Sequence, residues 1–323
     1  MNIAEGSTSE RLPFVGEDGL MPAVSRPQPG RLSRLAYVRS FADTNIWRIE
    51  TTGPGAPASS PPVLAISSTR GDGIAQLSGD GQKMTFMSDR AGESEVWVAD
   101  SSGTNAVQLT SLGAIPGFPR WSSDGKTIVF HSNAEDHPYG AVYIVPADGG
   151  RVRRITSDRS INAFPSFSRD GKWIYFSSTR TGTPSVWKIP VAGGNAVHVS
   201  PTAGLLALES TDGAHLYYVE SRTTDAMGPL WRLPLDGGAP TKLVDGVMST
   251  SFEVVERGVY YLERASGETK LRYFDFATHQ STLVAGNLGT VSFGLTASRD
   301  GRTILYSRVD SSVNDLMLVE NFR

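Results

Sequence analysis

Short hydrophobic runs separated by polar turns fill the segment 162–200. The four runs, FPSFS, WIYFSS, SVWKIP and AVHVS, are rich in β-branched and aromatic residues. The breaks between them contain Asp170-Gly171, Gly182 and Gly193-Gly194, and glycine readily takes the positive φ that a tight hairpin needs. The pattern therefore predicts a four-stranded antiparallel meander, which needs neighbouring sheets to bury both of its faces.

The same markers recur in the same order along the chain. An Asp-Gly turn comes first, and an aliphatic-aromatic pair follows on a later strand, roughly every 44 residues. That period, with four strands in each repeat, is typical of the blades of a β-propeller. The turn residues are Asp80, Gly81, Asp124, Gly125, Asp170, Gly171, Asp212, Gly213, Asp300 and Gly301. The aromatic residues are Trp47, Trp97, Tyr143, Trp187 and Trp231.

The repeats resemble the PD40 repeat, also called the TolB-like β-propeller repeat. Residues 119–126 and 165–172 carry the pattern P-x-[FW]-S-x-D-G-K, and residues 88–92 and 178–182 carry S-x-R-x-G. The resemblance covers nearly the whole chain after about Arg11. It is specific for the fold and says little about function, because similar repeats occur in proteins of many activities.

The repeats predict an all-β fold, a seven-bladed β-propeller of four-stranded antiparallel blades. Residues 1–10 are expected to be a disordered tail, and residues 11–323 a single domain. A closing strand at 11–16 is expected to complete the last blade, because pairing the two chain ends removes an open sheet edge. The blades are expected at about 21–67, 74–111, 117–157, 162–200, 204–244, 250–286 and 290–319.

The composition of the chain excludes several classes of function. The 323 residues suit one large all-β domain, and a net charge of −3 gives no basic surface for nucleic acid. The absence of cysteine excludes disulfides, thiolate catalysis and cysteine-ligated zinc. No apolar run has membrane-spanning length. We expect a soluble monomer, cytoplasmic or periplasmic, that binds no nucleic acid through this domain and inserts into no membrane.

Two groups of residues are candidates for binding. Arg90, Arg180 and Arg222 lie in loops expected between the second and third strands of their blades. Together they would suit a carboxylate or an acidic peptide end, and the alternative is an ion pair with a neighbouring blade. His131, Asp136 and His137 lie close together in sequence. Their side chains suit a metal ion, but a polar surface loop has the same composition, so we predict no metal and no cofactor.

The repeated residues are interpreted as structural. A large ring at one position in most blades fills the space between neighbouring blades, which explains it better than ligand stacking does. The Asp-Gly pairs fit tight turns, in which aspartate accepts from turn amides. The chain contains no G-x-S-x-G nucleophile motif. The motifs thus define a scaffold, and we predict that the domain is not an enzyme and has no catalytic residues.

Three functions remain open at this stage. The first is a protein-binding or sensory scaffold that presents its loop-rich face and channel mouth to a protein or peptide partner, as the resemblance to TolB implies. The second is the C-terminal sensory domain of a bacterial winged-helix regulator, since similar propellers follow such DNA-binding domains. The third is a metal-dependent lyase or the accessory domain of a prolyl-peptidase-like hydrolase, which similar propellers also accompany.

Overall fold

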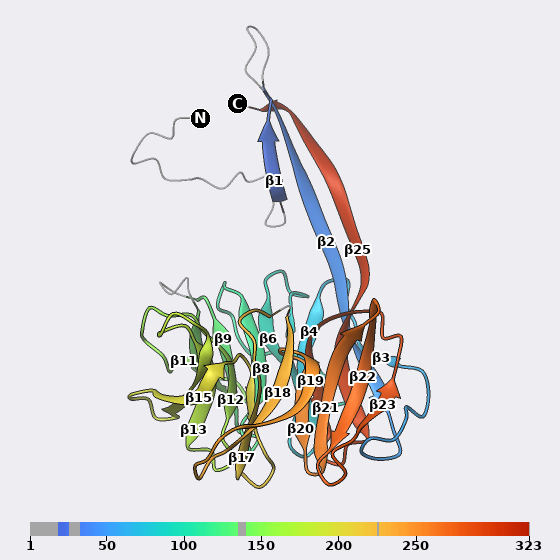
Figure 1. Cartoon of the computed structure of the whole chain (residues 1–323). Coiled ribbons are helices and arrows are strands. Elements are labelled where there is room, and N and C mark those ends of the chain that lie inside the picture. The colour runs from blue at the N-terminus through green and yellow to red at the C-terminus, as the bar shows by residue number, and fades with distance from the viewer. Residues whose placement is uncertain (1–18, 26–32, 135–139, 225, 323) are drawn as a thin grey trace. The chain divides into compact units, whose positions relative to one another are not determined.

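The computed structural model describes residues 19–25, 33–134, 140–224 and 226–322. Every helix or strand assigned within these ranges is a β-strand (Figure 1). None of these residues belongs to a helix that is long and apolar enough to cross a membrane. The chain divides into two compact units, one of residues 44–310 and one of the end segments 1–43 and 311–323.

Five sheets of the larger unit each contain four antiparallel strands that are consecutive in sequence. The inner strands are β4 (Asp72–Leu77), β8 (Pro116–Trp121), β12 (Asn162–Phe167), β16 (Ala207–Glu209) and β20 (Phe252–Val255). The second strands are β5 (Lys83–Ser88), β9 (Thr127–Ser132), β13 (Trp173–Ser178), β17 (His215–Val219) and β21 (Gly258–Ala265). The third strands are β6 (Glu95–Asp100), β10 (Ala141–Pro146), β14 (Ser185–Pro190), β18 (Met227–Pro234) and β22 (Glu268–Asp275). The outer strands are β7 (Val107–Gln108), β11 (Arg153–Arg154), β15 (Val197–Ala203), β19 (Thr241–Met248) and β23 (Ser281–Ala285).

The sixth sheet combines strands from both ends of the chain. In the larger unit its order is β24 (Thr290–Ala297), β25 (Thr303–Phe322), β2 (Ser33–Glu50) and β3 (Val63–Ile66). The inner strand β24 contacts β20 on one side and β4 on the other, and β4, β8, β12, β16 and β20 contact each other in turn. The six inner strands therefore form a closed ring, and the space that they surround is called the channel below.

The predicted count of seven blades is not confirmed, because the described residues form six sheets. Strands expected in separate blades at 21–67 and 290–319 share the sixth sheet, since β2 and β25 each continue without a turn. Neither 39–44 nor 308–312 contains glycine or proline, so neither segment favours a tight hairpin. The tail expected at 1–10 and the closing strand expected at 11–16 lie outside the described residues.

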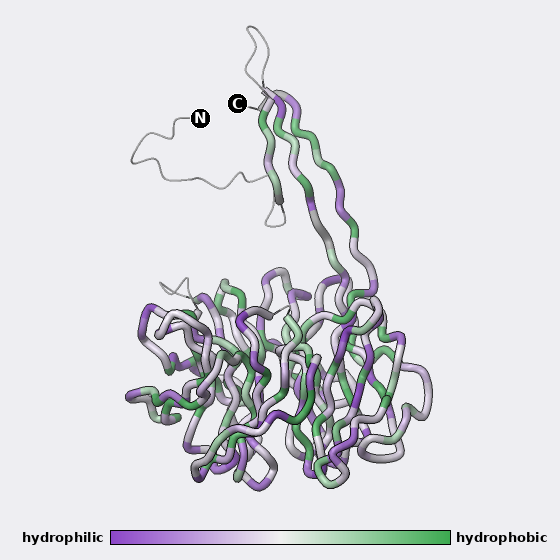
Figure 2. The backbone as a smooth tube through the Cα atoms, viewed as in Figure 1, coloured by the Kyte–Doolittle hydropathy of each residue, from purple (hydrophilic) through white to green (hydrophobic). Residues whose placement is uncertain are grey.

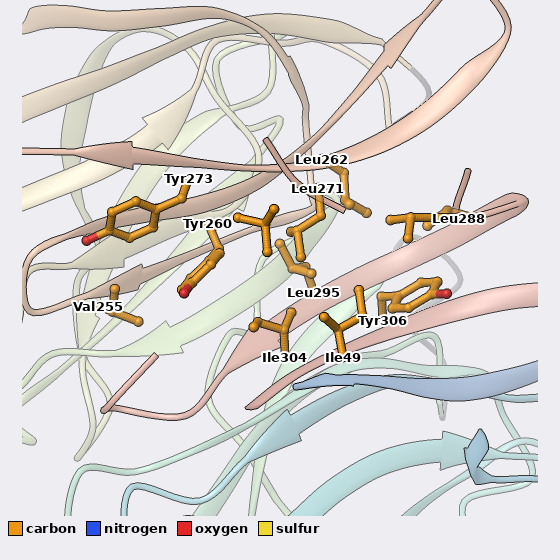
Figure 3. Close-up of a cluster of buried hydrophobic side chains, with 12 residues drawn as sticks. Ile49, Val255, Tyr260, Leu262, Leu271, Tyr273, Leu288, Leu295, Ile304 and Tyr306 are labelled. Atoms are coloured by element: carbon orange, nitrogen blue, oxygen red, sulfur yellow. The ribbon is translucent and has the colours of Figure 1, made fainter. Parts of the chain in front are cut away.

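Hydrophobic segments recur along these strands (Figure 2), and strands such as β8 and β20 are buried at every position, so the sheets can pack against each other through both faces. One buried cluster joins the sixth sheet to the sheet of β20 to β23. It contains Ile49 from β2 and Ile304 from β25, together with Leu271 and Tyr260 (Figure 3), and each of these side chains is at most 1% exposed. Burial of a large aliphatic side chain contributes about 1.5–3 kcal/mol. The two chain ends are thus held together by core packing as well as by backbone pairing.

The five Asp-Gly turns have one geometry. In the turn after β8, the Ser122 hydroxyl donates to the Asp124 carboxylate at 2.6 Å, and the Lys126 amide donates to the same oxygen at 3.1 Å. These bonds favour the charged carboxylate and lower the pKa of Asp124. Gly125 has φ +69°, a conformation that residues with a side chain rarely adopt. The same Ser–Asp bond occurs at Asp80, Asp170, Asp212 and Asp300.

The two ends of the channel differ in their loops. The Asp-Gly turns lie at one end, here called the turn face, and they line the cavities there. The other end is here called the loop-rich face. Its cavities are lined by the links between consecutive sheets and by the loops between second and third strands. The candidate residues of the sequence analysis were expected in those longer loops.

The smaller unit contains β1 (Gly19–Val24), paired antiparallel with the first part of β2. The pairing register shifts between Leu20 and Ala23, and Met21 has φ +51°. The Ser25 hydroxyl accepts from the Arg34 amide at 2.8 Å. Serine hydroxyls end the inner strands of the larger unit in the same way, as Ser78 does for Lys83. The β1–β2 hairpin therefore repeats the local geometry of an inner blade hairpin.

Candidate functional site

Four inner strands of the ring contain a β-bulge near the loop-rich face. The register between first and second strands shifts after Gly73, Gly117, Ala163 and Val291. At the bulges, Ile74, Phe118 and Phe164 have φ values of +52°, +50° and +53°. A positive φ is strained for residues of this size, and such strain is concentrated at functional sites. The bulges therefore mark this end of the channel as a candidate site.

Aromatic rings from different sheets meet at the bulges. The Phe118 ring lies edge-on to Phe164 with 4.7 Å between centroids, and 6.4 Å from the ring of Phe293 on β24. The His131 ring on β9 lies 5.4 Å from that of Phe164. These four residues, called the aromatic cluster below, come from three sheets and lie at the loop-rich end of the channel, here called the channel mouth. Aromatic rings in such a position supply a large apolar contact area.

His131 is held as a neutral ring. Its Nδ1 accepts a hydrogen bond from the Phe164 amide at 3.3 Å, which leaves Nε2 as the protonated nitrogen. The ring lies directly on Gly117, where an added Cβ would approach Nε2 to 2.5 Å. Removal of the imidazole from bulk water lowers the pKa of His131 from 6.5 to about 4. The side chain therefore contributes an uncharged donor to the channel mouth at neutral pH.

A cavity of about 520 Å³ lies beside the aromatic cluster. His131 and Phe164 line it, together with Ile115 and Ile161 from the links that precede β8 and β12. These two isoleucine side chains are 66% and 48% exposed, although they flank a concave surface. A mainly apolar cavity with a few polar groups is the usual form of a binding site.

Arg222 stands at the edge of this cavity. It lines the apolar cavity and also a second cavity of about 520 Å³, whose lining includes Ser200, Thr202 and Glu220. The Arg222 side chain is exposed, and within the described residues it has no ion pair or hydrogen bond. A guanidinium group in this position is available to a carboxylate or phosphate of a ligand.

The other two predicted arginines have structural partners. Arg90 Nη2 pairs with Asp72 Oδ1 at 2.7 Å, and its guanidinium lies 5.3 Å from the centre of the Trp97 ring. Arg180 pairs with Asp158 at 3.3 Å and lies 4.7 Å from the Trp187 ring. Neither arginine lines the two cavities that contain Arg222. Both arginines are therefore held in ion pairs, but not with a neighbouring blade as the alternative had it, because Asp72 begins β4 of the same sheet as Arg90 and Asp158 lies in the link before β12. The tryptophans of these third strands pack against the two guanidinium groups.

The remaining predicted site residues are only partly covered by the structure. Asp136 and His137 lie outside the described residues, so only His131 of that group is placed, and it belongs to the channel mouth. Within the described ranges, no three His, Asp or Glu side chains converge as a group that could hold a metal ion.

The phenylalanines of the aromatic cluster are not among the predicted site residues. A signal for two of them was present, because Phe118-Pro119 and Phe164-Pro165 occupy the same position of the repeat, as Met21-Pro22 does in β1. The proline is the second residue of the bulge pair and cannot donate to the strand ladder. An aromatic residue before a repeated proline therefore indicates a bulge residue in this chain.

The closed ring of four-stranded antiparallel sheets is a β-propeller, and the predicted fold class is confirmed. Residues 75–226 match the PD40 family model, described as the TolB beta propeller domain, which confirms the resemblance inferred from the repeats. No curated protein matches the sequence.

Solved structures resemble the fold at low sequence identity. The chain is similar to a putative TolB from Agrobacterium tumefaciens, with a TM-score of 0.67, 16% identity, and coverage of 84% of this chain and 99% of that one. It is similar to TolB from Acinetobacter baumannii, with a TM-score of 0.60, 17% identity, and coverage of 85% and 65%. A Mycobacterium tuberculosis puromycin-hydrolyzing peptidase gives a TM-score of 0.56, 13% identity, and coverage of 84% and 53%. At these identities the likeness shows the fold alone.

The neutral His131 leads to a pH-dependence of stability. Its folded pKa is about 4 against an ordinary 6.5, so the unfolded chain binds this proton more readily between those values. The free energy of unfolding should therefore fall as pH drops from 6.5 towards 4, by about 2 kcal/mol at pH 5 from this residue alone. The measurement compares urea unfolding of the wild type and His131→Gln at pH 7 and pH 5. A wild type that loses no more stability than His131→Gln would contradict the assignment.

Proposed function

We propose that this protein is a non-enzymatic scaffold that binds a peptide segment of a partner protein at the channel mouth of its loop-rich face. The observation that carries the proposal is the apolar cavity beside the aromatic cluster, with Arg222 at its edge, exposed and without an ion pair to any described residue. Apolar cavities receive side chains, and arginine binds carboxylates in a two-pronged geometry. The favoured ligand is a peptide with an apolar side chain next to a carboxylate, either an acidic residue or a chain terminus.

The rigidity of the site supports this function. The bulged residues belong to inner strands whose pairing is fixed on both sides of the bulge. A preformed site loses little conformational entropy when a ligand binds. The similarity to TolB propellers is compatible with a protein-binding role, whereas the peptidase matches this chain over only 53% of its own length. A hydrolytic role would require a catalytic domain in addition to this propeller.

The test begins with a peptide selected from a random library with free C-termini on the immobilised wild-type protein. Ile115→Ser and Arg222→Ala should each weaken its binding about tenfold or more, as measured by calorimetry, since they remove an apolar contact and a charge-assisted hydrogen bond. Both side chains are exposed, so neither change should disturb folding. The matched controls are Val107→Ser, 63% exposed on β7, and Arg151→Ala, an exposed arginine next to the Gly149-Gly150 turn.

The controls should bind the peptide as the wild type does. A selected peptide whose affinity is unchanged by both site variants, or is lowered as much by the controls, would exclude this site. A library that yields no binder to the folded protein would also count against the proposal.

A further inference from the structure

The opposite end of the channel contains a cluster of arginines. Arg120 on β8, Arg169 after β12 and Arg299 after β24 come from three different sheets. The only carboxylate in contact with their guanidinium groups among the described residues is Glu253, which pairs with Arg120 at 2.6 Å. Arg120 and Glu253 are 8% and 9% exposed, so this pair neutralises itself inside the protein. Arg169 and Arg299 have no such carboxylate partner among the described residues.

Arg169 is a partly buried cation whose side chain bonds no carboxylate of the described residues. Its guanidinium donates to the carbonyl oxygens of Ser210 at 3.2 Å and Glu209 at 3.4 Å. The Glu209 carboxylate itself accepts from the Arg169 backbone amide at 2.6 Å and from the Tyr175 hydroxyl at 2.7 Å. Burial lowers the pKa of Arg169, the charges of Glu253 and Glu209 oppose this shift, and the charges of Arg120 and Arg299 add to it. A bound anion would stabilise the charged guanidinium in the same way as these carboxylates do.

Arg299 faces the same space. Its guanidinium lies against Gly79, where an added Cβ would approach Nη2 to 2.7 Å, so the glycine makes room for it. The Arg299 side chain is exposed, and within the described part of the chain no carboxylate pairs with it. It lines an inner cavity of about 80 Å³ together with Arg169 and with Glu253, whose carboxylate is paired with Arg120. It also lines the adjoining outer cavity of about 670 Å³, where Lys83 and Lys126 lie beside the carboxylates of Asp80, Asp124 and Asp148.

Hydroxyl groups complete the inner cavity. Ser123 and Thr211 line it with exposed side chains that make no hydrogen bond within the described residues. The aspartates of the neighbouring turns are already occupied by serine hydroxyls and backbone amides. Two guanidinium groups and two free hydroxyls provide many donors for a group with several oxygens. Phosphate fits this donor set better than a carboxylate, which has two oxygens.

We propose that the turn face holds a binding site for a phosphate group, with Arg169 and Arg299 as its main ligands. Free phosphate would occupy the inner cavity. A phosphomonoester would place its organic part in the outer cavity, near Lys83 and Lys126. The site lies at the other end of the channel from Arg222 and does not rest on the proposed peptide-binding function.

The test titrates the wild-type protein with inorganic phosphate and, separately, with phenyl phosphate at low ionic strength, followed by calorimetry and melting temperature. Arg299→Gln should weaken binding of phosphate about tenfold, because it removes a charged donor from the exposed edge of the site. Gly79→Ala should also weaken binding, since its new methyl group displaces the Arg299 guanidinium. Arg151→Gln is the control for a general loss of positive charge.

Saturable phosphate binding that Arg299→Gln and Gly79→Ala weaken and Arg151→Gln leaves unchanged supports the proposal. Tighter binding of phenyl phosphate identifies phosphomonoesters as the ligand class, and tighter binding of phosphate identifies the free anion. The absence of saturable binding, an equal response to acetate, or equal binding by all four proteins would overturn it.

Discussion

Replacing Arg120 by methionine should lower the free energy of unfolding by about 3–5 kcal/mol, because the Glu253 carboxylate would lose its partner inside the channel. Glu253→Met should have a similar effect by leaving the Arg120 guanidinium unpaired. The measurement is guanidinium chloride unfolding followed by tryptophan fluorescence.

The double variant Arg120→Met with Glu253→Met is the decisive control. Two apolar residues of similar size carry no desolvation penalty, so the double variant should be far more stable than the sum of the single changes implies. Stability losses that simply add would show that the pair is not coupled, contrary to the 2.6 Å contact. Single variants with losses below about 1 kcal/mol would instead fit a solvent-exposed pair.

Replacing Ile304 by alanine should cost about 2–5 kcal/mol, because a cavity would open in the cluster that joins the two chain ends (Figure 3). Ile304 is fully buried between Ile49 on β2 and residues of the adjoining sheet. Val63→Ala, in β3 of the same sheet and 51% exposed, is the control and should change stability by less than about 0.5 kcal/mol. Both are measured by chemical unfolding, and equal losses in the two variants would contradict closure of the ring through this cluster.

The sequence predicted the repeating part of the fold because its signals are local. A Ser-x-Asp-Gly turn fixes five of the six inner hairpins of the ring through bonds between residues at most five positions apart, as at Ser168, Asp170 and Trp173. The chain ends lack such signals. Residues 39–44 and 308–312 contain no glycine or proline, and the pairing of β2 with β25 joins segments over 250 residues apart, as the bond from the Trp47 indole to Asp310 shows. Pairing over such a distance cannot be inferred from local pattern.

The β1–β2 hairpin bears on the predicted seventh blade. Met21 repeats the bulge conformation of Phe118 and Phe164, and each of the three precedes a proline. The β1–β2 pair thus has the local geometry of an inner blade hairpin. The predicted division of residues 11–67 into a closing strand and a first blade remains a prediction.

The candidate sites were predicted less well than the fold. Arg222 was selected from its loop position, but Arg90 and Arg180 were selected for the same reason and pair with Asp72 and Asp158. A loop arginine is available to a ligand only if folding places no carboxylate side chain beside its guanidinium group. The Arg120–Glu253 pair, separated by 133 positions, has no local signal at all.

Hydrogen–deuterium exchange of the protein with and without the selected peptide would locate the binding site. Peptide bound at the channel mouth should slow exchange in the link before β12 and in the loop that contains Arg222, with no change at the Asp-Gly turns of the opposite face. Protection confined to the turn face, or to the outer strands of the sheets, would contradict peptide binding at the channel mouth.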